Sequence, residues 1–293
     1  MAALTLATAA IGQNNPMAGK LITEGVSLPS GATIRLPEPS MADGLGAKAQ
    51  QTVLKQVADK YPVEQFLRNS VVAPFVLKME SLTGATGERV GQRIDLWFVA
   101  HGTLQAVRDK KLLGELIAID KAKSPILETK NETLDDRELA QRQIRVASTP
   151  DREETYSAFS APILEKVQLS GVNRQMVTPS DGSIVAAQEL APQFANDARY
   201  PNQWRSIQRT PTGRIALGEP HAYSGNGQYV KVTSLVDAAG KPTGALLVEA
   251  HMVFDEPQGW FGGANLLRSK LPLAVQENVR EFRRLLQQSS KKD

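Results

Sequence analysis

The segment Ala245–Phe254 constrains the fold more than any other part of the chain, because it contains no Gly or Pro and little charge. Its odd-numbered positions mix aliphatic residues with Glu249 and His251. Side chains alternate between the two faces of a strand, so one face is expected to meet a dry core while the other carries a polar pair. The even-numbered positions are uniformly apolar: Leu246, Val248, Ala250, Met252 and Phe254.

A sharp turn and a helix follow this strand. Asp255-Glu256-Pro257 ends the strand, because Pro cannot donate a hydrogen bond to a neighbouring strand. Nearby glycines place Trp260 and Phe261 on a tightly turned loop, and a helix is expected to begin near Pro272. One apolar stripe marks the buried side of that helix, which predicts that Phe282 packs against a sheet. The stripe consists of Val275, Val279, Phe282 and Leu286.

The closing helix also carries positive charge. From Arg268 to Asp293 the chain has seven Lys or Arg residues and three Asp or Glu residues. Arg280, Arg283 and Arg284 lie away from the centre of the apolar stripe, so a peripheral contact with an anionic surface is expected there. A basic helix back that is simply solvated is the alternative interpretation.

Upstream of the anchor, alternating and β-rich runs predict further strands separated by turns. Helical periodicity is confined to residues 49–60, 104–119 and a patch at 134–144. The sequence therefore predicts an α+β fold in which an antiparallel sheet packs on the long C-terminal amphipathic helix. The expected strands are residues 71–82, 90–101, 155–160, 166–177, 183–190 and 228–236.

Three regions are predicted along the chain. Residues 1–12 include the apolar run Ala2–Ile11, which is either a signal-peptide remnant or an Ala-rich disordered start. The first interpretation predicts a bacterial protein that is periplasmic or secreted. Residues 13–48 are rich in Gly, Pro, Ser and Asn and are expected to form a flexible linker, so that Met1–Leu36 is dispensable for folding. Residues 49–290 are expected to form a single α+β domain.

Several classes of function are excluded or disfavoured by composition. The chain has 293 residues and no cysteine, which excludes disulfides, thiol catalysis and thiolate zinc sites. No run approaches the roughly 20 apolar residues of a transmembrane helix, so no transmembrane segment is predicted. Basic residues are not interleaved with aromatic ones, so no nucleic-acid partner is expected. The chain carries no Gly-rich phosphate loop, and no cofactor is predicted.

The candidate polar chemistry lies on two strands. Glu249 and His251 share one strand face and Asp255 follows at the strand end, a combination that suits general acid–base work or a partly buried hydrogen-bonded pair. Asp95, Trp97 and His101 share a face of an earlier strand, so His101 and His251 are expected to converge on one cavity if the two strands are neighbours; scattered polar positions on a half-exposed face are the alternative. No second histidine motif completes a metal site, and no metal is predicted.

The turn and the closing helix resemble the end of the START lipid-transfer domains, within the SRPBCC helix-grip superfamily. The resemblance covers about the last quarter of the chain. It implies a curved antiparallel sheet around the C-terminal helix, with an apolar cavity that binds a lipid or another hydrophobic small molecule. The residues that carry it are Asp255, Gly259, Trp260, Asn265-Leu266-Leu267, Leu271-Pro272 and the stripe Val275–Leu286.

Three functions remain open. The first is an exported soluble protein that binds a hydrophobic small molecule or lipid in a cavity between sheet and helix. The second is a secreted structural or interaction protein whose core is filled. The third is an enzyme that uses His251 with Glu249 or Asp255. The expected ligand-binding residues are Glu249, His251, Trp97, His101, Trp260 and Phe261.

Overall fold

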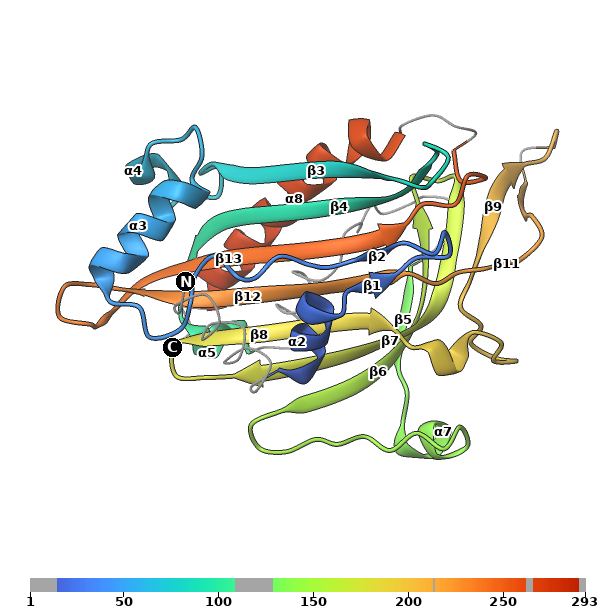
Figure 1. Cartoon of the computed structure of the whole chain (residues 1–293), viewed down its shortest axis with the longest axis horizontal. Coiled ribbons are helices and arrows are strands. Elements are labelled where there is room, and N and C mark those ends of the chain that lie inside the picture. Colours follow the sequence, from blue (N-terminus) through green and yellow to red (C-terminus); the bar gives the residue numbers. More distant parts are fainter. Residues whose placement is uncertain (1–14, 109–128, 213, 262–265, 290–293) are drawn as a thin grey trace.

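A computed structural model describes residues 15–108, 129–212, 214–261 and 266–289 (Figure 1). The predicted signal-peptide region, residues 1–12, and most of the helix predicted at 104–119 lie outside the described residues. No helix within the described ranges is both long and apolar enough to cross a membrane.

The described strands β3 to β13 join into one antiparallel sheet. The strand order along its main path is β10-β9-β7-β8-β12-β13-β4-β3. Strand β6 pairs with the other edge of β7, and β5 pairs with β6. The short strand β11 pairs with β9. The strands are β3 (Phe75–Thr83), β4 (Arg89–His101), β5 (Lys130–Thr133), β6 (Glu153–Ile163), β7 (Val167–Pro179), β8 (Ser183–Leu190), β9 (Gln203–Arg209), β10 (Ile215–Leu217), β11 (His221–Ala222), β12 (Asn226–Val236) and β13 (Pro242–Asp255).

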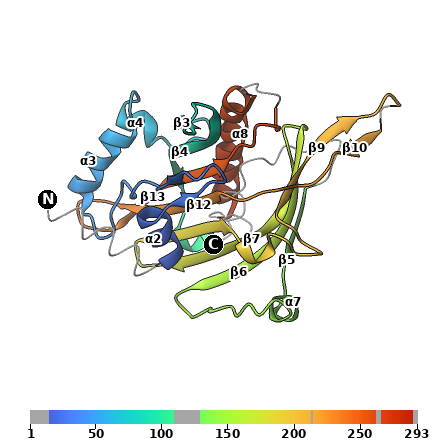
Figure 2. The ribbon, with the colours of Figure 1, turned by 45° about the vertical axis from the view of Figure 1, so that its right-hand side comes forward.

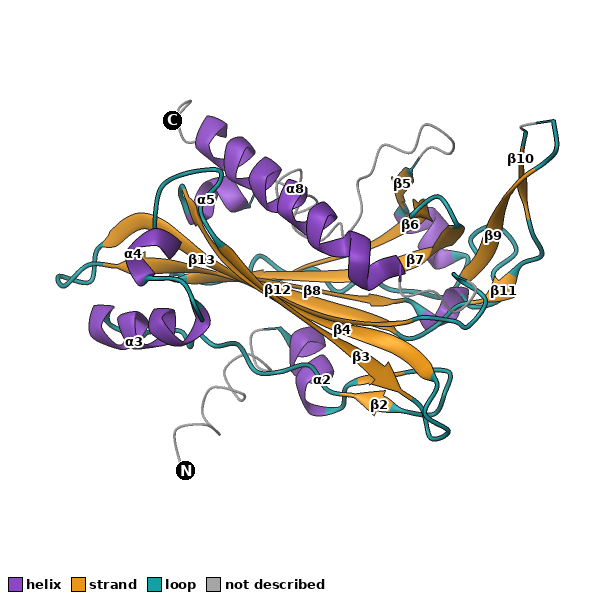
Figure 3. Cartoon of the chain, turned by 90° about the horizontal axis from the view of Figure 1, so that it is seen from above, coloured by secondary structure: helices purple, strands orange, loops and turns teal. Residues whose placement is uncertain are grey.

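The predicted anchor strand is β13, which lies between β12 and β4 in the sheet. The sheet curves at β5, β6 and β7 toward the side on which helix α8 (Leu266–Ser289) lies (Figures 2 and 3). We call this side the inner face and the opposite side the outer face. A curved antiparallel sheet packed on a long C-terminal helix confirms the predicted α+β, helix-grip-like fold class.

Helix α8 packs on the inner face through the predicted stripe. Phe282 is 1% exposed, and its ring meets Phe98 of β4 edge to face, with 5.8 Å between the ring centroids. The helix begins at Leu266, six residues before the predicted start at Pro272. Its first turns are held by Leu267 and Leu271, which are buried and extend the stripe by two further positions. The burial of these apolar side chains therefore outweighs the loss of the backbone hydrogen bond that Pro272 cannot donate.

The outer face is covered by the N-terminal part of the chain. Helices α2 and α3 pack there, and Figure 3 shows them on the opposite side of the sheet from α8. The other short elements of the described chain are α5 (Leu104–Val107), α7 (Asp136–Ala140) and the 3-10 turn η1 (Pro192–Phe194). The elements of the N-terminal part are α2 (Pro16–Thr23), β1 (Val26–Ser27), β2 (Thr33–Ile34), α3 (Ala47–Val57) and α4 (Val63–Phe66).

The interpretation of residues 13–48 as a flexible linker is wrong for the described part of that region. Met17, Leu21, Leu36 and Met41 are each at most 3% exposed, and Asn15 caps α2 while donating to Met176 O on β7. The density of Gly and Pro reflects tight turns between short packed elements rather than looseness. Each apolar residue fills its own place on the outer face, so no regular period marks the segment in the sequence.

Arg283 is a second correction, because this side chain is not on the basic back of α8. It is 2% exposed and donates from Nε to Val99 O at 2.9 Å, from Nη1 to Ala73 O at 2.6 Å and from Nη2 to Pro74 O at 2.9 Å. Burial lowers the pKa of Arg283 to about 10. Its guanidinium therefore ties α8 to the start of β3 and the end of β4, and contact with an anionic surface falls to Arg280 and Arg284.

We expect Arg283→Met to lower the free energy of unfolding by about 2–3 kcal/mol, because the methionine keeps the apolar stem but leaves buried carbonyl oxygens without donors. Urea denaturation measures the loss. Arg284→Met is the matched control, since Arg284 is exposed and pairs with the exposed Glu281, and it is expected to change stability by less than about 0.5 kcal/mol. Equal losses in the two variants contradict the anchoring role.

Candidate functional site

A cavity of about 710 Å³ lies between the inner face of the sheet and the first half of α8. Its floor is formed by β6, β7, β8 and β12, and Leu267, Leu271 and Ala274 of α8 line it from the opposite side. The cavity exists because the sheet curves at β5–β7, while α8 stays over β4 and β3. Under β13 and β4, by contrast, the inner face is filled by side chains of α8.

One end of the cavity is apolar and aromatic. Phe159 and Ile163 line it from the end of β6, and Leu169 lines it from the part of β7 that pairs with β9. Tyr223 and Trp260 close the same end and stack on each other, with 5.6 Å between their ring centroids. Trp260 is 4% exposed, and its Nε1 has no hydrogen-bond partner in the described part of the chain. This end therefore combines apolar walls with one buried donor.

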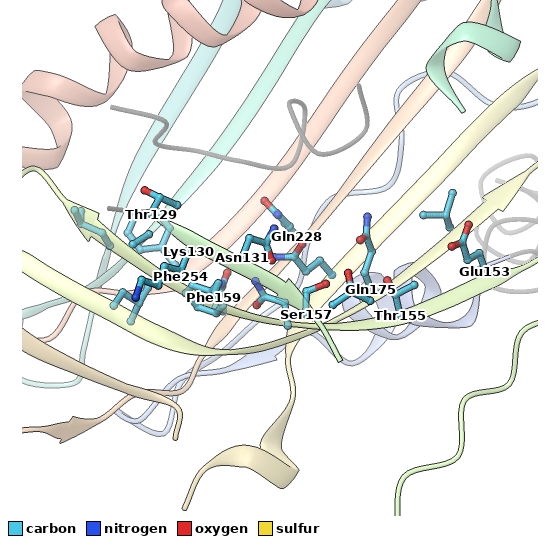
Figure 4. A pocket seen from close by; sticks show the side chains of 18 of the residues that line it. Thr129, Lys130, Asn131, Glu153, Thr155, Ser157, Phe159, Gln175, Gln228 and Phe254 are labelled. Atoms are coloured by element: carbon cyan, nitrogen blue, oxygen red, sulfur yellow. The ribbon is translucent and has the colours of Figure 1, made fainter. Parts of the chain in front are cut away.

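The middle of the floor is polar but uncharged. Gln175 of β7 lies directly opposite Gln188 of β8, and Gln188 lies directly opposite Gln228 of β12. Thr155 of β6 continues the row on the other side of Gln175. Figure 4 shows Thr155, Gln175 and Gln228 rising from the sheet into the cavity. We call these four side chains the amide row.

The next inward row of the sheet adds two more uncharged polar groups. Ser157 of β6 lies opposite Asn173 of β7, and both line the cavity. Asn173 Oδ1 is buried and has no hydrogen-bond partner among the described residues. Beyond the amide row in the other direction the floor is apolar again, with Val177 and Ile184. The cavity thus has a polar band between two apolar ends.

Three of the four charged side chains that line the described cavity are exposed at its edge. The four are Arg108, Lys130, Arg152 and Glu153, of which Arg108, Lys130 and Glu153 are exposed. Figure 4 shows Glu153 at one end of the labelled set, and Lys130 between Thr129 and Asn131 toward the other end. Ionised groups therefore flank the polar band without entering it.

Glu249 and His251 do not line this cavity. The even-numbered face of β13 packs on α8, so the odd-numbered face that carries the pair points to the outer face. Both side chains are fully buried there under residues 37–43, on the side of the sheet opposite to the one predicted. The alternation of side chains along the strand correctly predicted that Glu249 and His251 share one face. It did not show which part of the chain covers that face.

Neighbouring groups bind both side chains of the outer-face pair, although His251 Nε2 has no hydrogen-bond partner in the described part of the chain. Glu249 accepts hydrogen bonds from the backbone N–H groups of Ser40 at 2.7 Å and Met41 at 3.2 Å. His251 donates from Nδ1 to Asp95 Oδ1 at 2.8 Å, and its Nε2 lies 3.9 Å from Glu249 Oε2, which is too long for a hydrogen bond. Burial disfavours the charged imidazolium, but the two carboxylates outweigh burial and raise the pKa of His251 above its ordinary value.

The other predicted site residues fall into separate groups. Trp97 belongs to the outer-face cluster, where its Nε1 donates to Ser40 Oγ at 3.0 Å and its ring meets His251 edge to face. His101 lies at the end of β4 and donates from Nε2 to Leu67 O at 2.9 Å, so the two histidines do not meet in one cavity. Trp260 lines the cavity, and Phe261 packs against it.

The enzyme hypothesis that uses His251 gains no support from this geometry. A substrate has no route to His251, because the side chain is fully buried and does not line the cavity. Asp255 lies four residues further along β13, on another part of the outer face, and does not contact the imidazole. The pair instead fastens residues 40 and 41 to the sheet.

Asp255 is itself an unusual carboxyl group. It is 6% exposed, and burial together with the neighbouring charge of Glu256 raises the pKa of Asp255 to about 7. Glu256 stays paired, since its carboxylate accepts from Gln92 Nε2 at 2.9 Å and lies 2.7 Å from Arg89 Nη2. Asp255 is therefore held in its protonated form below neutral pH.

This shift predicts a pH-dependent stability. The folded-state pKa of Asp255 lies above the ordinary value of 3.8. Asp255 therefore contributes to the free energy of unfolding fully below pH 3.8, and this contribution is lost as the pH rises through about 7. The free energy of unfolding of the wild type is expected to decline between pH ~4.5 and ~7.5, and Asp255→Asn is expected to remove about 1–3 kcal/mol of that decline. Urea denaturation at both pH values measures it. Parallel profiles for the two proteins contradict the assignment.

The residues that the sequence analysis missed are the amides of the cavity floor. Gln175, Gln188 and Gln228 come from three strands, and each one alone is an ordinary polar residue in a strand. A weak local signal exists at Asn173 and Gln175, which are polar at consecutive inward positions of β7, although the other face of this strand also carries polar residues such as Arg174 and Thr178. Only the register between strands reveals that the amides form a row.

No protein-family model matches the chain, and no curated protein matches it. Among solved structures, a fragment of a STAR-related lipid transfer protein from Xanthomonas axonopodis is similar, with 13% identity and a TM-score of 0.38 over 72% of this chain and 93% of that one. An uncharacterized protein from Rhizobium leguminosarum is similar with 9% identity and a TM-score of 0.29, over 71% of this chain and 98% of that one. A STAR-related lipid transfer protein is thus among the similar structures. The identities and TM-scores are low, so the function is argued from the chain's own residues.

Proposed function

We propose that the protein binds a hydrophobic small molecule or lipid in the cavity between the sheet and α8. The observation that carries this proposal is the cavity itself, whose volume of about 710 Å³ falls in the range of small-molecule sites, about 300–1,000 Å³. Apolar walls with a few convergent polar groups are typical of such sites. The unpartnered donor of Trp260 at the apolar end adds a group that a ligand satisfies.

The alternative of a structural protein with a filled core fits the cavity less well. A filled core requires the sheet and the helix to be in contact along the whole inner face, because protein interiors pack as densely as organic crystals. Here that contact holds under β4 and most of β13 but not over β6 and most of β7. A space of this size, lined by buried polar atoms such as Asn173 Oδ1 that lack a hydrogen-bond partner in the described chain, favours occupancy by a ligand.

The remaining expectations extend the proposal. We propose export to the periplasm or the medium, which the apolar run Ala2–Ile11 supports. The intact mass of the protein from the periplasmic fraction of its host tests this, and full-length protein confined to the cytosol contradicts it. Contact of α8 with an anionic surface stays a prediction that rests on Arg280 and Arg284.

A fluorescence titration with the uncharged apolar probe N-phenylnaphthylamine tests ligand binding. The wild type is expected to bind the probe saturably at one site, with a blue-shifted emission from an apolar environment. Ala161→Trp places an indole in the cavity from the floor strand β6 and is expected to reduce binding at least tenfold. Ala239→Trp, in the exposed turn between β12 and β13, is the matched control and is expected to bind like the wild type.

The outcomes separate binding in the cavity from adsorption to the surface. Equal binding by Ala161→Trp and Ala239→Trp contradicts the proposal, as does the absence of saturable binding to the wild type. Thermal melting of each variant establishes that the fold is retained. Ala274→Trp approaches the same space from α8 and replaces Ala161→Trp if that variant does not fold.

A further inference from the structure

We propose that the ligand of this cavity is uncharged and carries a hydroxyl, carbonyl or amide group in the middle of its apolar body, where the amide row hydrogen-bonds it. The inference rests on the proposed function and names the chemical class of the ligand. It is drawn from the register of four strands and from the distribution of charge around the cavity.

The amide row is a continuous hydrogen-bonding surface. The side chains of Gln175, Gln188 and Gln228 are direct cross-strand neighbours, so all three stand on the same face of the sheet. Each primary amide offers a carbonyl acceptor and two N–H donors. The row therefore serves donors and acceptors equally, as a ligand with hydroxyl, carbonyl or amide groups requires.

Two of these amides, those of Gln175 and Gln188, are not needed to hold the fold together. The described chain supplies no hydrogen bond to the side chains of Gln175 and Gln188, and Asn173 Oδ1 beside them is buried without a partner. Leaving such groups unpaired under an apolar ligand costs about 1–3 kcal/mol each. A ligand with a polar group at this depth removes that cost, and a plain hydrocarbon chain does not.

The distribution of charge decides against an ionised group at the same depth. A carboxylate or phosphate in a dry cavity needs a paired cation, because burial of an isolated charge is far more costly than burial of an amide. Of the basic residues that line the described cavity, Arg108 and Lys130 are exposed at its edge, and half-buried Arg152 precedes β6, where its Nη2 donates to Ala147 O rather than to the amide row. The group recognised by the amide row is therefore neutral.

The position of the row between two apolar regions fixes where that group lies. Val177 and Ile184 flank the row on one side, and Phe159, Ile163 and Leu169 lie beyond the Ser157–Asn173 pair on the other. A molecule that fills both regions presents its middle to the amides. Fatty-acyl compounds with a polar group only at one end do not match this pattern.

Methyl ricinoleate and methyl oleate provide a matched pair of probes, since both are uncharged and only the first has a mid-chain hydroxyl group. We expect the wild type to bind methyl ricinoleate about three- to tenfold more tightly, in competition with N-phenylnaphthylamine, as one to two net hydrogen bonds provide. Gln188→Leu is expected to abolish or reverse this preference. Gln208→Leu is the control, because Gln208 is exposed on β9 outside the cavity.

Each outcome has a distinct meaning. Tight binding of both esters with no preference for the hydroxyl keeps the proposed function and overturns the amide-row inference. A preference that persists unchanged in Gln188→Leu and in Gln175→Leu also overturns it. Failure of the wild type to bind either ester or the fluorescent probe overturns the proposed function and the inference with it.

Discussion

A chain that begins at Pro37 is expected not to fold cooperatively. The truncation removes α2, β1 and β2, whose apolar side chains are buried against β8, β12 and β13. Burying one aliphatic side chain contributes about 1.5–3 kcal/mol, so the loss is comparable to the entire stability of a domain, about 5–15 kcal/mol. The side chains involved, each at most 6% exposed, are Met17, Leu21, Ile22, Val26 and Leu28.

This result reverses the expectation from sequence that Met1–Leu36 is dispensable. Circular dichroism during urea titration measures the truncated protein, and a sigmoidal transition within about 1 kcal/mol of the wild type contradicts the packing described above. In the full-length chain, Leu21→Asp isolates the effect of α2 by placing a charge in the same buried position. Glu24→Ala, at an exposed position of the same segment, is its control.

Phe282→Ala is expected to lower the free energy of unfolding by about 3–5 kcal/mol, because a large buried side chain is lost and the cavity left behind relaxes only in part. Phe282 is the centre of the stripe that fixes α8 to β4, where its ring contacts Phe98. Urea denaturation at equilibrium measures the change.

The same helix provides the control for this variant. Leu273 is 59% exposed, so Leu273→Ala is expected to change stability by less than about 0.5 kcal/mol. A loss of that small size for Phe282→Ala as well contradicts the docking of α8 on the sheet. The alignment of the sheet with α8, and with it the depth of the cavity, depends on this contact.

The elements with strong periodicity were predictable from the sequence. Residues 245–254 and 228–236 form central strands, and the stripe from Val275 to Leu286 faces the sheet, because alternation and the spacing of a helix act over a few neighbouring residues. The meander of residues 155–190 is likewise present as β6, β7 and β8. These local rules were sufficient for the fold class.

The covering of the anchor strand was not predictable by the same rules. Glu249 requires donors in a buried place, and these are the backbone N–H groups of Ser40 and Met41, more than two hundred residues away in the chain. Lys231 and Tyr229 fasten the same stretch by donating to Met41 O and Pro37 O. A hydrogen bond from a backbone group does not depend on the identity of a side chain. The sequence therefore shows that a buried Glu249 needs hydrogen-bond donors, but not which residues supply them.

The cavity floor escaped prediction for a related reason. A row of amides depends on the pairing of β7 with β8 and of β8 with β12, and a shift of one residue in either pair moves its members to opposite faces. The apolar end depends on a contact between distant segments, where Trp260 after β13 stacks on Tyr223 before β12. Of the predicted ligand contacts, only Trp260 lines the cavity, with Phe261 packed against it.

Native mass spectrometry of the protein purified from its own host tests the central claim most directly. The wild type is expected to carry a small, uncharged apolar molecule that is released on denaturation, whereas Ala161→Trp, whose indole occupies the cavity, is expected to carry none. A wild-type protein without any bound molecule, or the same molecule retained by Ala161→Trp, contradicts the account.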